Sequence, residues 1–112
     1  MARHKAPNHL RPATSRWWST VLREFDLEDH HVRLLTLAAT AWDRAEAARE
    51  TILAEGAVFL DRFDQPKARP EVAIERDATI TFARLLRELD LDVDPPSAPG
   101  RPPALRSNNR GR

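Results

Sequence analysis

The 112-residue chain contains no cysteine, only three glycines and no long apolar run. Without cysteine it can form no disulfide, no thiolate nucleophile and no zinc–cysteine site. Its isolated glycines cannot build a glycine-rich phosphate loop. Its apolar stretches are far shorter than a membrane span, and residues 1–16 are polar and basic, unlike a signal peptide. These absences predict a soluble protein of a reducing cytoplasm.

Residue sets that would support catalysis or metal binding are also missing. His30 and His31 are adjacent, so on a helix their side chains diverge and cannot jointly hold one metal ion. The alternating aspartates at positions 90, 92 and 94 lack the glycine and the distal glutamate of a calcium loop. No organised base accompanies the hydroxyls of Ser15, Ser19 and Thr20. The sequence therefore predicts no enzyme, with no catalytic residue, no metal site and no cofactor.

Two prolines and one glycine predict where the helices begin and end. Pro12 suits the first position of a short helix that should end near Phe25 or Asp26. A long helix is expected from about Asp29 to Glu55, because this stretch lacks proline and glycine, and Gly56 is a natural stop. The fold class is accordingly mainly α, with a short first helix and a long second one.

The third helix should follow a small β-hairpin or an extended loop. An apolar run at residues 57–60, a polar turn at 61–66 and a second extended piece at 67–69 give that expectation. Pro70 then begins the third helix, which closes over residues 90–94 before Pro95-Pro96. The chain thus divides into a basic flexible arm at 1–10, a helical domain at 11–94 and a disordered, basic, proline-rich tail at 95–112.

The long helix carries more apolar surface than one helical partner covers. We therefore expect one packing partner within the chain and a second from another subunit. The candidate residues for that oligomer interface are Leu35, Ala39, Trp42 and Ile52. Trp17 and Trp18 point about 100° apart on a helix, so they should contact different segments.

Charge is segregated along the chain. Residues 17–94 contain ten of the 18 lysines and arginines and all 17 acidic residues, so the helical body is acidic between two basic arms. Two interpretations of the arms are equally supported by the charge pattern: solubilising disordered ends, or flexible contacts to nucleic-acid phosphates. In the second interpretation the candidate phosphate-binding residues are Arg3, Lys5, Arg11, Arg16, Arg101, Arg106, Arg110 and Arg112.

The order of the motifs resembles that of a known family. His9-Leu10-Arg11-Pro12 is followed by Trp17-Trp18 and, later, by Ile52-Leu53-Ala54-Glu55-Gly56. After these come Asp61-Arg62-Phe63-Asp64-Gln65-Pro66-Lys67, the proline-started segment from Arg69 to Asp77, and the leucine-rich run from Phe82 to Leu91. Over residues 9–94 this succession is similar to the P27 family of phage terminase small subunits.

The resemblance implies a role in DNA packaging. Such subunits assemble into homo-oligomeric rings, recognise viral double-stranded DNA at the packaging start and regulate the terminase large subunit, which carries the ATPase and nuclease activities. It also implies that the protein works in the cytoplasm of the bacterial host. An alternative remains open: a protein-binding adaptor or regulatory helical protein that makes no contact with DNA.

Overall fold

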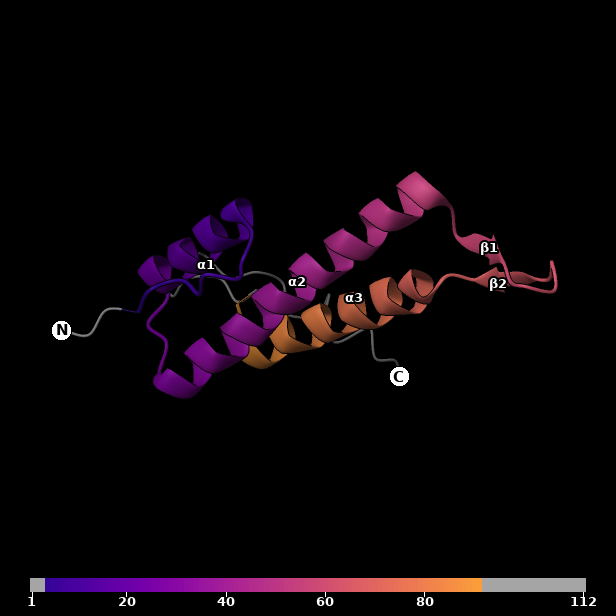
Figure 1. Cartoon of the computed structure of the whole chain (residues 1–112). Helices are drawn as coiled ribbons and strands as arrows, with labels where there is room; N and C mark the ends of the chain where they lie inside the picture. The colour runs from indigo at the N-terminus through magenta and orange to yellow at the C-terminus, as the bar shows by residue number, and fades with distance from the viewer. Residues whose placement is uncertain (1–3, 92–112) are drawn as a thin grey trace, which may run out of the picture.

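The computed structural model describes residues 4–91 and contains three helices and one β-hairpin (Figure 1). Helix α1 spans Pro12–Glu24, α2 spans Asp29–Glu55 and α3 spans Pro70–Leu89. Strands β1, Val58–Leu60, and β2, Pro66–Ala68, lie between α2 and α3. The predicted fold class is confirmed: the chain is mainly α, with a short first helix, a long second helix and a third helix after the hairpin.

The long helix α2 is the element on which the other two helices pack. Helix α3 runs back alongside it, α1 lies against its N-terminal half, and the β-hairpin projects beyond the far end of the α2–α3 pair (Figure 1). The molecule is correspondingly elongated, with principal extents of 60 × 44 × 21 Å. The hairpin and α1 therefore lie towards opposite ends of the molecule.

The helix starts are built in different ways. Pro12 and Pro70 occupy the first turns of α1 and α3, as predicted, but the preceding Arg11 and Arg69 make no side-chain cap. At the start of α2 the amide of Glu28 donates a hydrogen bond to Nδ1 of His31, at 3.3 Å. His31 thus has a structural role at a helix start, where free backbone donors need partners.

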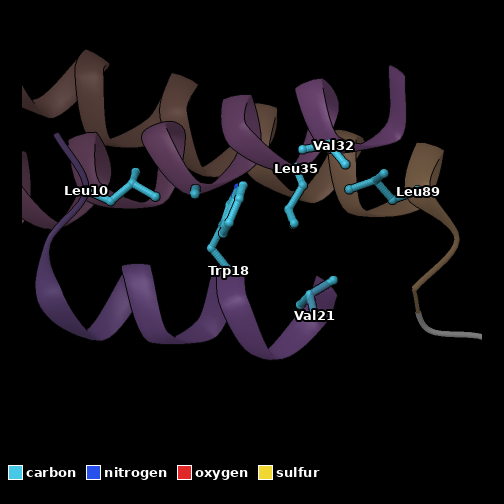
Figure 2. Close-up of a cluster of buried hydrophobic side chains, with 7 residues drawn as sticks. Leu10, Trp18, Val21, Val32, Leu35 and Leu89 are labelled. Atoms are coloured by element: carbon cyan, nitrogen blue, oxygen red, sulfur yellow. The ribbon is translucent and has the colours of Figure 1, made fainter. Parts of the chain in front are cut away.

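The core lies where α1 crosses α2 and the end of α3 (Figure 2). Trp18 of α1 is 2% exposed and points between Leu35 of α2 and Leu10, which precedes α1. Leu89 closes the cluster from α3. Because Leu10 is buried, the packed body begins before α1 and includes part of residues 1–10, the segment predicted as a basic arm.

Small residues line the contact between α2 and α3. The buried alanines of α2 recur at alternating spacings of three and four, which places them on one stripe of the helix. They are Ala38, Ala41, Ala45 and Ala48, and Ala78 of α3 is buried with them. Side chains this small let the two helices approach closely. Most of the larger buried apolar side chains therefore lie where α1 packs on α2.

Within residues 4–91, no helix is both long enough and apolar enough to cross a lipid bilayer.

Candidate interaction surfaces

The β-hairpin is a preformed turn that holds apolar side chains in solvent. Oδ1 of Asp61 accepts hydrogen bonds from the amides of Phe63, at 2.8 Å, and Gln65, at 3.0 Å. Asp64 adopts the left-handed conformation, with φ of +60°. These contacts fix the turn, because an aspartate that bonds its own downstream amides replaces a backbone turn.

Nothing in the described part of the chain covers this hairpin. Phe63 is 69% exposed and Leu60 is 61% exposed, and Val58 and Phe59 are exposed beside them. The strands pair in antiparallel register, with Val58 opposite Ala68 and Leu60 opposite Pro66. A two-stranded hairpin with three-residue strands is marginally stable by itself. Its local hydrogen bonds therefore stabilise a shape that leaves Val58, Leu60 and Phe63 more than half exposed.

Arg69 joins the base of the hairpin to the end of α2. Its Nε donates to the carbonyl oxygen of Gly56 at 2.9 Å, and its Nη2 donates to that of Glu55 at 3.3 Å. The guanidinium carbon also lies 5.8 Å from the centroid of the Phe59 ring. A cationic side chain at the C-terminus of a helix donates hydrogen bonds to the free carbonyls of the last turn and interacts favourably with the negative end of the helix dipole. Arg69 thereby fixes the direction in which the hairpin projects.

A second apolar surface lies where all three helices meet. Trp17 of α1, Trp42 of α2 and Phe82 of α3 surround a hollow of about 260 Å³, completed by Ala13 and Thr14. The Phe82 ring centroid lies 5.0 Å from that of Trp42 and 5.9 Å from that of Trp17. Trp42 remains 44% exposed. We call this site the aromatic hollow.

A groove continues from the aromatic hollow between α1 and α3. Its volume is about 580 Å³, and Trp17 and Phe82 line both sites. On the α1 side its wall includes Glu24 and Phe25; on the α3 side it includes Leu86, Arg87 and finally Leu91. We call it the α1–α3 groove.

The four residues predicted for an oligomer interface separate into two groups. Leu35 and Ala39 are 0% exposed and lie in the chain's own core, so they offer no surface to a second subunit in this conformation. Trp42 is at the rim of the aromatic hollow, and Ile52 is half-buried near the end of α2. The exposed hairpin residues were not among the predicted set.

The predicted phosphate-binding residues are only partly within the described chain. Lys5 and Arg16 are exposed, and Arg3 and the four tail arginines lie outside residues 4–91. Arg11 instead forms a two-pronged contact with Glu50, at 2.8 and 3.1 Å. The hydrogen bond from Arg11 lowers the pKa of Glu50, and the same bond raises the pKa of Arg11. Arg11 is therefore engaged with α2 rather than held out for a phosphate.

Residues 4–91 contain no group of three histidine, cysteine or carboxylate side chains placed to hold a metal ion. The His30 and His31 rings lie with their centroids 4.1 Å apart, and His31 is engaged at the start of α2.

The chain matches no protein-family model, no curated protein and no solved structure.

Proposed function

We propose that the protein is a non-catalytic, self-assembling DNA-packaging subunit of the terminase small subunit type. In this role it binds viral double-stranded DNA at the packaging start and regulates the large ATPase and nuclease subunit. The observation that supports assembly is the β-hairpin, whose fixed turn holds Val58, Phe59, Leu60 and Phe63 in solvent. The order of the sequence motifs supports the choice of class.

The hairpin favours association because exposed apolar area is unfavourable in water, at roughly 25 cal/mol per Å². Contiguous exposed apolar patches on soluble proteins are typical of interaction sites. Aromatic side chains such as Phe59 and Phe63 bury about 150–250 Å² each when covered. A stable interface needs about 800 Å² per partner, so the hairpin would form the centre of an interface and neighbouring helix surface its remainder.

DNA contact is assigned to the ends of the chain rather than to its middle. The helical body is acidic, which disfavours close approach of a phosphate backbone. Lys5 and Arg16 are exposed near one end, and Arg101, Arg106, Arg110 and Arg112 follow the described part at the other. Lysine and arginine side chains bind a phosphate backbone by releasing condensed counterions, without reading base sequence.

Assembly is tested by the mass in solution, measured by light scattering, of the full chain and of Phe63→Ser. The wild-type chain should be oligomeric, and the variant should shift towards monomer without loss of helicity. Ile80→Ser, at an exposed residue of α3 away from the hairpin, is the matched control. A monomeric wild-type chain at micromolar concentration contradicts the proposal.

DNA binding is tested by the salt dependence of affinity for double-stranded DNA. Each phosphate contact contributes about 0.9 to the slope of log affinity against log salt concentration. Replacing the arginines at 101, 106, 110 and 112 by glutamine should therefore flatten that slope. Unchanged slopes exclude the tail as the DNA contact.

One observation favours the adaptor alternative: an apolar hairpin on an acidic body also suits a protein partner. An adaptor would show no affinity for DNA at any salt concentration while the hairpin still mediated association. DNA binding therefore separates the two functions, because an association mediated by the hairpin is compatible with either of them.

A further inference from the structure

We propose that residues 95–103 of this chain dock in the aromatic hollow and the adjoining α1–α3 groove. The hollow is apolar, open and lined by one large aromatic ring from each helix. Trp42 stays 44% exposed although Phe82 lies only 5.0 Å away from it. No residue between 4 and 91 covers this site.

The described chain ends on the wall of the groove. Leu91 lines the α1–α3 groove together with Phe82 and Trp17, and these two rings also line the hollow. An extended chain spans about 3.3 Å per residue, so Pro95 can lie up to about 13 Å from Leu91. The helical rise of about 1.5 Å per residue separates Phe82 from Leu89 by only about 10 Å. The segment from Pro95 onward can therefore reach both rings without displacing any described element.

The composition of the segment suits an aromatic groove. Residues 95–103 read Pro-Pro-Ser-Ala-Pro-Gly-Arg-Pro-Pro, with Pro96, Pro99 and Pro102 at intervals of three. Proline fixes its own φ, and a proline-rich segment favours the polyproline II helix, which has three residues per turn. Grooves lined by aromatic side chains bind such segments at low entropic cost, because the ligand is already ordered. One proline edge would thus face Trp17, Trp42 and Phe82.

The charges of the groove favour placing Arg101 of the docked segment on the α1 side. Glu24 lines the α1 wall of the groove and has no ion-pair partner within 4.0 Å among residues 4–91. Arg101 is the only charged residue of the segment and supplies the opposite charge. Arg87 lines the α3 wall, so it favours placing Arg101 on the α1 side.

A tethered segment also has an advantage over a free partner. A short linker gives an effective concentration in the millimolar range, so even weak contacts are occupied within one chain. The competing occupant is the hairpin of a second copy, because Phe63 is an exposed ring of suitable size. The two occupants differ in their dependence on protein concentration.

The test follows the three tryptophan indole N–H signals by two-dimensional ¹⁵N–¹H NMR. The full chain is compared with the full-length variant P96A/P99A/P102A and with a chain ending at residue 94. Trp18 is the internal reference, because it is 2% exposed and its Nε1 donates to Oγ1 of Thr36 at 3.1 Å. An unshifted Trp18 signal shows that the core of each variant is folded.

We expect the Trp17 and Trp42 signals to shift away from their wild-type positions in both altered chains. Each signal should shift to the same position in the two chains. In the wild-type chain the positions should not change when the protein is diluted. The matched control is the full-length variant R106Q/R110Q/R112Q, which keeps every proline and should retain the wild-type positions. Because no DNA is present, the proposal can fail while the proposed packaging function stands, and the reverse.

Three results would overturn the proposal. Identical Trp17 and Trp42 signals in the full and shortened chains show that the tail does not occupy the hollow. If the wild-type signals move on dilution and Phe63→Ser also moves them from their wild-type positions, the hollow is occupied by a second copy of the chain. Shifts caused equally by the arginine variant show a general effect of tail charge rather than proline docking.

Discussion

Asp43 of α2 accepts a hydrogen bond from the buried hydroxyl of Thr14 of α1, at 2.6 Å. The other carboxylate oxygen of Asp43 accepts the amide hydrogen of Arg11, at 2.8 Å. One side chain of the long helix thus satisfies a free donor at the start of the short helix and anchors its first turn. This contact replaces the local cap that Arg11 does not provide.

Replacing Asp43 by alanine should destabilise the fold by about 1–3 kcal/mol, because the Thr14 hydroxyl would stay buried without an acceptor. The measurement is chemical denaturation at a fixed protein concentration, since association would shift the apparent stability. Asp77→Ala is the matched control, because within residues 4–91 the exposed Asp77 carboxylate pairs only with the neighbouring, exposed Arg76. A loss for Asp43→Ala no larger than that of the control would show that the contact does not anchor α1.

Truncating Trp18 should have the largest effect of any single core substitution. Trp18→Ala should cost about 3–5 kcal/mol, since it leaves a large cavity between α1 and α2. Small domains have total stabilities of about 5–15 kcal/mol, so circular dichroism should show a marked drop in melting temperature or partial unfolding. Trp18→Phe keeps most of the side-chain volume but loses the hydrogen bond to Thr36. Its stability should therefore lie between that of wild type and that of Trp18→Ala. Trp42→Ala, at an exposed residue, should have little effect on stability by comparison.

The helix boundaries could be predicted because each depends on one residue with a local backbone preference. Pro12 and Pro70 begin helices, and Gly56 ends one. The divergence of Trp17 and Trp18 was also predictable from helical geometry: Trp18 enters the core and Trp17 turns towards Phe82. What each ring would contact was not, since periodicity identifies a face of a helix and not its partner.

The same limit explains why two of the residues predicted for an oligomer interface lie in the chain's own core. Leu35 and Ala39 lie on an apolar stripe of α2, and sequence alone could not decide whether α1 or another subunit would cover it. The hairpin could be predicted from its turn residues, but its exposure depends on where α2 ends and on the contacts of Arg69. Exposure depends on how the elements pack, so the aromatic hollow and the uncovered hairpin could be recognised only in the three-dimensional structure.

The ion pair between Arg11 and Glu50 should make a small, pH-dependent contribution to stability. The hydrogen bond from Arg11 lowers the pKa of Glu50 in the folded chain. A glutamate with a lowered folded pKa stabilises the fold above its unfolded pKa of about 4.3, and the contribution is lost as the pH falls through the folded value. The stability difference between wild type and Glu50→Gln should therefore shrink on acidification below about pH 4.3.

Denaturation of wild type and Glu50→Gln at a series of pH values between neutral and acid measures this difference. Because the pair is exposed, the difference should also decrease with added salt. A difference that is constant from neutral to acid pH would mean that ionisation of Glu50 does not contribute.

Any other residue at Gly56 should destabilise the fold, for reasons of backbone conformation rather than of space. Its φ of +92° and ψ of 162° lie in a region that is essentially restricted to glycine. A Cβ atom added there would have room, because its nearest neighbour is the Val58 carbonyl oxygen at 3.8 Å. Gly56→Ala and Gly56→Asn should therefore both destabilise the fold, by about 1–3 kcal/mol.

The comparison with Asp90 makes this prediction specific. Asp90 ends α3 with φ of 60° and ψ of 37°, the left-handed helical conformation that asparagine accepts readily. Asp90→Asn should therefore leave stability nearly unchanged, while Gly56→Asn should cost as much as Gly56→Ala. Thermal melts of the three variants against wild type give the ranking. If asparagine rescued position 56 relative to alanine, the chain would leave α2 through a left-handed helical residue, and the direction assigned to the hairpin would be wrong.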